Sequence, residues 1–146
     1  MKKNIAFIIV ISVAFFSCSP KVTMPPVVKT KFASLYPDAK NVKWDNENAL
    51  FEAGFKINGR ETSVVFDAAG TVTETETAIV ASALPATITE YVSKNLSGKK
   101  IDEAAKIVDA SGKVTYEAEV DEADYIFDET GNFISNKEKD KEEDKD

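Results

Sequence analysis

The stretch FEAGFKING, residues 51–59, combines a strand pattern with a turn signal. From Phe51 to Ile57, apolar residues alternate with polar or small ones, so one side of a strand would be apolar. Asn58-Gly59 favours the type I′ turn of a two-residue hairpin, because both central positions need a positive φ. Residues 61–66 then return as a partner strand. The segment predicts an antiparallel hairpin with one buried face and one polar face.

This hairpin has a counterpart in the second half of the chain. Phe51-Glu52-Ala53 is matched by Tyr116-Glu117-Ala118, and Phe66-Asp67-x-x-Gly70 is matched by Phe127-Asp128-x-x-Gly131. A helical apolar pattern precedes each copy. Three features in the same order predict an internal duplication.

Each copy opens with an amphipathic helix and continues with strands. The helical stripes are Val28, Phe32, Leu35 and Tyr36 in the first copy, and Ile88, Tyr91, Val92 and Leu96 in the second. Strands are expected within 42–44, 51–57, 61–66, 71–77, 114–120, 125–127 and 133–135. Residues 101–108 fit either a helix or a strand, and comparison with the first copy favours a strand.

The expected fold class is therefore α+β. Two tandem helix-plus-antiparallel-hairpin repeats, at about residues 27–80 and 84–136, form one sheet with the helices on one face. Neither half is large enough for a core of its own, so we expect one shared core.

The N-terminus has the pattern of an export signal. Lys2 and Lys3 precede an apolar run from Ile5 to Phe16. This run is shorter than the ~20 residues of a membrane span and is typical of a secretory h-region. Ser17-Cys18 resembles the lipobox of bacterial lipoproteins, which implies cleavage before Cys18 and diacylation of its sulfur. The alternative is an ordinary signal peptide with an incidental cysteine.

We accordingly expect a signal peptide over residues 1–17, a lipidated tether over 18–26, and membrane attachment through Cys18. Ser19 follows the cysteine where an Asp would mark inner-membrane retention in many lipoproteins. By that analogy the expected location is the cell envelope, as an outer-membrane lipoprotein that faces either the periplasm or the cell surface. At the other end, residues 137–146 read KEKDKEEDKD and contain no apolar residue. We expect a disordered charged tail there, with an interaction tail as the alternative.

The residues between tether and tail resemble a known family. Leu35-Tyr36-Pro37-Asp38-Ala39-Lys40 after a helix, followed by a hairpin and Phe66-Asp67-x-x-Gly70, is similar to the PepSY-like domains. These are also described as β-lactamase-inhibitor-like domains of bacterial envelope proteins. The resemblance spans residues 27–136, although the second copy has Leu96-Ser97-Gly98-Lys99 where Tyr-Pro would stand. It implies helices packed on an antiparallel sheet, an extracytoplasmic location, and a role in binding or inhibition. It carries over no catalytic residue.

The amino-acid composition excludes most classes of enzyme. The chain has 146 residues, 18 Lys+Arg against 25 Asp+Glu, a net charge of −7, one Cys and no His. It therefore lacks the residues for Ser-His-Asp or Cys-His catalysis, for a disulfide framework and for a thiolate zinc site. The acidic balance disfavours nucleic acid as a partner, because its backbone is bound by Lys and Arg. No cofactor and no metal are predicted.

Carboxylates are the remaining candidates for chemistry. They gather at Glu117, Glu119, Asp121, Glu122, Asp124, Asp128 and Glu129. A calcium site would use such oxygens, but the twelve-residue EF-hand spacing is missing, and we favour a solvated acidic face. A carboxylate-pair hydrolase is the one enzyme class left open, although no spacing identifies a pair. Asp67 and Asp128 are better explained as turn residues that bond their own backbone.

We therefore predict a non-enzymatic binding module that recognises a protein or peptide through its sheet. Lys43, Glu52 and Lys56 are the candidate binding residues, because they alternate with core residues. Phe51, Phe55, Phe66 and Phe127 are assigned to the core, whereas Trp44, Tyr36 and Tyr91 could be core residues or partner anchors. The alternative function is a structural or stress-related envelope protein without a discrete site.

Overall fold

The computed structural model describes residues 24–47 and 49–138. Cys18, the predicted signal peptide and residues 139–146 lie outside the described residues. In chain order the elements are α1 (Pro26–Leu35), β1 (Lys40–Glu47), β2 (Leu50–Ile57), β3 (Arg60–Phe66), β4 (Val72–Ala78), a 3-10 turn η1 (Ala81–Ala83), α2 (Ala86–Asn95), β5 (Glu103–Asp109), β6 (Val114–Val120), β7 (Ala123–Asp128) and β8 (Phe133–Glu138).

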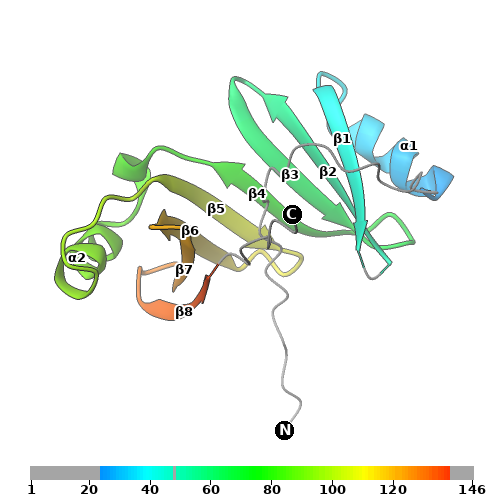
Figure 1. The fold of residues 1–146 in the computed structure, drawn as a ribbon. Helices are drawn as coiled ribbons and strands as arrows, with labels where there is room; N and C mark the ends of the chain where they lie inside the picture. The colour runs from blue at the N-terminus through cyan, green and yellow to red at the C-terminus, as the bar shows by residue number, and fades with distance from the viewer. Residues whose placement is uncertain (1–23, 48, 139–146) are drawn as a thin grey trace, which may run out of the picture.

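All eight strands form one antiparallel sheet in the order β1 to β8, so each strand pairs with the next one along the chain. One helix and four strands are followed by a second helix and four strands. The expected α+β class with a single sheet is confirmed, and the ambiguous segment 101–108 is largely strand β5. In Figure 1, α1 lies beside β1 at one end of the sheet, and α2 lies at the other end.

Both helices lie on the same face of the sheet. Residues that pair directly across antiparallel strands share a face. The α1 cluster contains Ala53 and Val64, and that row continues through Thr75 to Val108. On β5, Val108 shares its face with Ala104, which belongs to the α2 cluster. The expected placement of the helices on one face is thus correct.

Aromatic packing under α1 holds the first half together. Phe32 is 7% exposed, and its ring centroid lies 5.1 Å from Trp44 and 5.2 Å from Phe55. Tyr36 follows at 5.5 Å from Phe32 and 4.8 Å from Phe55. Phe66 is fully buried in the same cluster. Trp44 and Tyr36 are therefore core-packed residues rather than exposed anchors.

Aromatic residues also pack under α2 in the second half, but fewer rings take part. Ile88 and Phe127 are fully buried. Tyr91 packs edge-on against Phe127, with ring centroids 5.3 Å apart, and stacks on Phe133 at 5.1 Å. Edge-to-face and offset pairs of this kind add about 0.5–1.5 kcal/mol each beyond area burial. Tyr91 thus also belongs to the core of its half. The expectation of one shared core is wrong, because the buried residues on the helix side of the sheet form two clusters, one under each helix.

The folded elements extend slightly beyond the expected limits of the domain. The α1 helix begins at Pro26, and Met24 already packs against the first cluster. The last strand continues to Glu138, so residues 137–138 belong to the sheet rather than to the tail. Within the described segments, both α-helices are too short to cross a bilayer.

Candidate binding face

The face of the sheet opposite the helices, here called the helix-free face, is defined by the alternate rows of paired residues. One row runs Gly54, Ser63, Glu76, Ile107 across β2 to β5. By the same register the acidic residues of this face are Asp45, Glu52, Glu61, Glu74, Glu76, Glu103, Asp109, Glu117, Glu119, Asp124 and Asp128. Its basic residues are Lys40, Lys43, Lys56 and Lys137. Carboxylates therefore dominate the middle of the face.

The three residues predicted for binding all lie on this face. Lys43 pairs with Gly54, and Glu52 pairs with Asp45. The Lys56 Nζ forms an ion pair with Glu61 at 3.4 Å. Lys43 and Lys56 are exposed on the first strands, whereas Glu52 is half-buried. Lys43 and Lys56 are therefore exposed cations, whereas Glu52 belongs to the group of carboxylates in the middle of the face.

Two carboxylates that the sequence analysis did not single out lie at the centre of the face. The pKa of Glu76 is raised to about 8, chiefly by burial and then by the nearby charges of Glu117 and Glu74. Burial also raises the pKa of Glu74 to about 7, with the charge of Glu52 as the next cause. Both groups lose hydration and face like charges, which disfavours the ionised form. Alternation of Thr and Glu in β4 was visible in the sequence, but the neighbours across the strands were not.

The floor of the helix-free face is buried, although neither α1 nor α2, the two α-helices of the described residues, covers it. Val65, Ile107 and Ile126 are 2–3% exposed, and Ser63 is 3% exposed. Asp124 is 1% exposed, so the expected solvated acidic face is wrong at this residue. Glu117 and Glu119 are half-buried rather than fully hydrated. The face is thus a continuous surface of packed side chains with carboxylates between them.

Asp67 and Asp128 organise the turns between strands, as the sequence predicts. The Asp67 carboxylate accepts hydrogen bonds from the backbone N–H groups of Ala69 at 2.9 Å and Thr71 at 2.8 Å. The Asp128 carboxylate accepts from the N–H groups of Thr130 and Asn132, both at 2.9 Å. These bonds hold the pKa of both carboxyls below the ordinary value, and for Asp128 the side-chain amide of Asn132 is the largest cause.

A third turn of the same design joins β5 to β6, and sequence analysis missed it. Asp109 accepts hydrogen bonds from the Ser111 hydroxyl at 2.6 Å and from the N–H of Lys113 at 3.0 Å. The pKa of Asp109 is lowered, chiefly by the Ser111 hydroxyl. Asp109-Ala-Ser-Gly112 repeats the Asp-x-x-Gly spacing of the other two turns, so the signal was present in the sequence.

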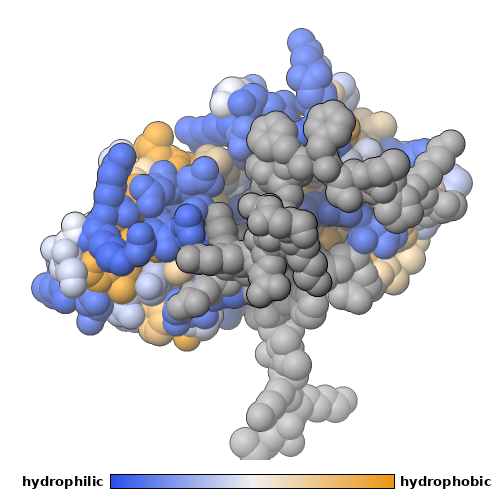
Figure 2. Space-filling view, in the orientation of Figure 1, coloured by the Kyte–Doolittle hydropathy of each residue, from blue (hydrophilic) through white to orange (hydrophobic). Residues whose placement is uncertain are grey.

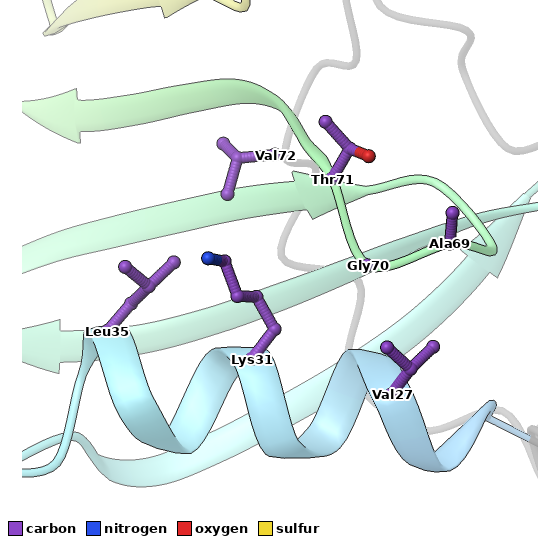
Figure 3. A pocket seen from close by; sticks show the side chains of 7 residues that line it. All are labelled: Val27, Lys31, Leu35, Ala69, Gly70, Thr71 and Val72. Atoms are coloured by element: carbon purple, nitrogen blue, oxygen red, sulfur yellow. The ribbon is translucent and has the colours of Figure 1, made fainter.

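A shallow groove of about 550 Å³ lies between α1 and the β3–β4 turn, away from the acidic rows. Figure 3 shows Val27, Lys31 and Leu35 projecting from one side of α1 toward the turn at Gly70 and Val72. The lining residues include no carboxylate, so this groove offers no acid pair for hydrolysis. Across residues 24–47 and 49–138, no group of three or more potential ligands is arranged to hold a metal ion.

Aromatic side chains of the sheet lie on the helix side and not on the helix-free face. Trp44 pairs with Ala53, and Tyr116 pairs with Phe127, both in rows that face the helices. In the coloured part of Figure 2, hydrophilic residues predominate, with smaller hydrophobic patches between them. Any partner of the helix-free face would therefore meet charge and backbone rather than an aromatic patch.

The described residues thus form an antiparallel eight-stranded sheet with two helices on one face and a broad polar surface on the other. The model of the family described as "Putative beta-lactamase-inhibitor-like, PepSY-like" matches residues 48–135, more than half of the chain. The protein belongs to this PepSY-like family, and the predicted resemblance is confirmed. The family description is inhibitor-like and names no enzymatic activity. Among curated proteins, none matches the chain.

Solved structures from Bacteroides species share the fold. One, described as a putative periplasmic protein from Bacteroides eggerthii, has a TM-score of 0.70 at 18% identity and covers 78% of this chain and 88% of its own. A DUF2874 family protein from Bacteroides uniformis has a TM-score of 0.66 at 21% identity, covering 77% and 88%. A BLIP-like protein from Bacteroides fragilis has a TM-score of 0.63 at 21% identity, covering 86% and 93%. At these identities the likeness concerns the fold.

Proposed function

We propose that the protein is a non-enzymatic extracytoplasmic binding module that recognises a basic segment of a protein or peptide through its helix-free face. The observation that carries the proposal is the one-sided charge of the sheet. Two helices cover one face, and among the residues whose side chains the structure describes, eleven carboxylates against four lysines occupy the other. Family membership supports a binding role, because the family is described as inhibitor-like.

Electrostatics favours this choice of partner. A broad surface of one sign attracts segments of opposite charge and accelerates encounter in a salt-dependent way. The lysines at positions 43 and 56 lie on the first strands, so they would set the orientation of a bound segment. The acidic middle, including Glu52, would supply the attraction.

The proposal is tested by capture from envelope extract with two matched triple variants. Lys43→Glu, Glu52→Lys and Lys56→Glu together reverse the predicted binding residues. The control is Lys29→Glu, Glu90→Lys and Lys94→Glu, which makes the same charge changes on exposed helix residues. The first variant loses the two lysines that orient the bound segment and the attraction of Glu52, so it should capture a partner specific for the helix-free face more weakly than wild type, whereas the control should capture it as well as wild type. A partner that binds both variants as tightly as wild type would remove this face from consideration.

A structural or stress-related envelope protein is the second candidate. The observation that favours it is the absence of aromatic side chains from the paired rows of the helix-free face within the described strands. Such a protein would give no saturable capture in the experiment above, at low as well as at physiological salt.

We also propose that the mature protein is anchored by lipid on Cys18 to the outer membrane, with residues 18–23 as tether, 24–138 as the binding domain and 139–146 as a charged tail. The export pattern supports this location, as does the solved neighbour from Bacteroides eggerthii that is described as a putative periplasmic protein. Wild type should incorporate a radioactive fatty acid during growth, whereas Cys18→Ser should not. Equal labelling of the two would contradict the lipid anchor.

We further propose that the two halves descend from one duplicated unit. Each half has the order helix then four strands, and each Phe-Asp-x-x-Gly turn approaches the first turn of its own helix, at Val27 and at Thr87.

A further inference from the structure

We propose that the helix-free face is a proton-sensitive surface centred on Glu74 and Glu76, which gains negative charge and weakens the sheet as pH rises through neutrality. This is a regulatory property of the face to which the proposed function assigns binding. The pH response is a property of the domain alone. Only its biological meaning rests on the proposed binding function.

The geometry places the two residues where carboxylates crowd. Glu74 and Glu76 lie on β4, one residue apart on the same face, and β4 is the central strand that joins the two halves. Glu74 pairs with Asp109 on β5 and with Val65 on β3, and Val65 in turn pairs with Glu52. Neighbouring strands are about 4.8 Å apart, so these carboxylates stand within one or two strand spacings of each other.

Glu76 occupies the more enclosed position. It pairs with Ser63 on one side and Ile107 on the other, and both partners are 3% exposed. Neither partner can neutralise a carboxylate. Ionisation of Glu76 is therefore opposed by lost hydration and by the charges of Glu117, Glu74, Glu52 and Asp124, while the neutral acid fits the site.

Charged groups on every neighbouring strand contribute to the field at this centre. They are Lys40, Lys43 and Asp45 on β1, Glu52 and Lys56 on β2, Glu61 on β3, Glu103 and Asp109 on β5, Glu117 and Glu119 on β6, Asp124 and Asp128 on β7, and Lys137 on β8. Lys56 on this list is already engaged with Glu61 at 3.4 Å. The balance of the field is acidic.

The direction of the response follows from proton linkage. The pKa values of Glu74 and Glu76 in the folded state, about 7 and about 8, exceed the ordinary value of 4.5. Between pH 4.5 and 8 the folded state binds more protons than the unfolded chain, so the free energy of unfolding decreases as pH rises. Below pH 4.5 both states are protonated at these groups, and above pH 8 both are ionised. The sensitive window is thus pH 4.5–8.

A direct test follows the ¹³C resonances of the side-chain carboxyl groups in the wild-type domain from pH 4 to 10. The expected result is a titration midpoint for Glu76 above pH 7, with Glu74 at a lower midpoint that is still above pH 6. Midpoints below pH 5.5 for both residues would overturn the proposal. This experiment uses no substitution, so it tests the proposal even if a variant fails to fold.

A second arm measures urea unfolding midpoints at pH 6 and pH 9 for wild type, Glu76→Gln and Glu129→Gln. Gln mimics the neutral acid, and Glu129 is an exposed turn residue. We expect the wild-type and Glu129→Gln midpoints to fall by the same amount between the two pH values, and that of Glu76→Gln to fall by clearly less. Equal falls for all three would overturn the proposal. Neither arm contains a partner, so failure here is separate from failure of the binding function.

Discussion

Gly131 lies against Thr87, where the β7–β8 turn meets the first turn of α2. The Thr87 hydroxyl donates a hydrogen bond to the Thr130 carbonyl at 2.9 Å, and a Cβ added at Gly131 would overlap that hydroxyl oxygen. The same Cβ would lie 3.0 Å from the Thr87 Cβ and 3.2 Å from Cγ1 of Ile88. Gly131 is thus required twice, for its φ of +87° and for the close approach of the helix.

Gly131→Ala should therefore destabilise the domain more than Gly112→Ala. Gly112 has nearly the same φ, +83°, in a turn of the same Asp-x-x-Gly design, but its Cβ would meet nothing within 4 Å. The left-handed backbone alone costs an Ala about 1–2 kcal/mol, and the clash with α2 adds to this only at Gly131. Urea denaturation gives both values. Equal losses in the two variants would contradict the described contact between turn and helix.

Gly59 and Gly70 provide a second matched pair. Both have a positive φ, +77° and +82°, but the Cβ of residue 70 would lie 3.3 Å from Val27 whereas that of residue 59 meets open space. Val at either position should cost about 1–3 kcal/mol from backbone strain, with the larger loss at Gly70. Thermal melts of the two variants measure the difference. Unchanged melting of Gly59→Val would contradict the Asn58-Gly59 type I′ turn.

The strands, the Asn58-Gly59 hairpin and the two Phe-Asp-x-x-Gly turns could be predicted because each depends on residues close together in the chain. The contact of Gly131 with Thr87 could not, since it joins segments 44 residues apart by packing alone. For the candidate face, alternation identified Lys43, Glu52 and Lys56 as residues of one side. It could not show that Glu76 is surrounded by acids, because that depends on the register of β4 between β3 and β5.

The strands expected at 114–120 and 125–127 placed a turn between β6 and β7, but they did not predict its backbone conformation, which offers a stabilising change. Asp121 and Glu122 have φ values of +56° and +62°, which suit a type I′ turn. Asp tolerates this conformation, but it is unfavourable for Glu122. Glu122→Gly should relieve this strain and raise stability by about 0.5–1 kcal/mol, despite the greater freedom of Gly in the unfolded chain. Asp121 keeps its ion pair with Lys99 in this variant. A lowered urea midpoint would count against the turn geometry.

Asp128 should determine how much stability the domain loses at low pH. Its pKa is lowered in the folded state, so the stability it provides is complete above the unfolded value of about 3.8 and is lost as pH falls below it. Asp128→Asn should unfold at lower urea than wild type at pH 6, and the difference should shrink at pH 2.5. Asp38→Asn, an exposed change outside the turns, is the matched control. A constant difference between Asp128→Asn and wild type at both pH values would refute this account of the turn.

The central claim is that partners bind the helix-free face, and carbodiimide footprinting of carboxyl groups tests it most directly. The captured partner is added to the wild-type domain, and the modification of each acid is measured by mass spectrometry. The account predicts protection of Asp45, Glu61, Glu103 and Glu119 on the helix-free face, with unchanged modification of Asp38 and Glu90 on the helix side. Protection of Asp38 and Glu90, with full modification of the four acids on the sheet, would contradict it.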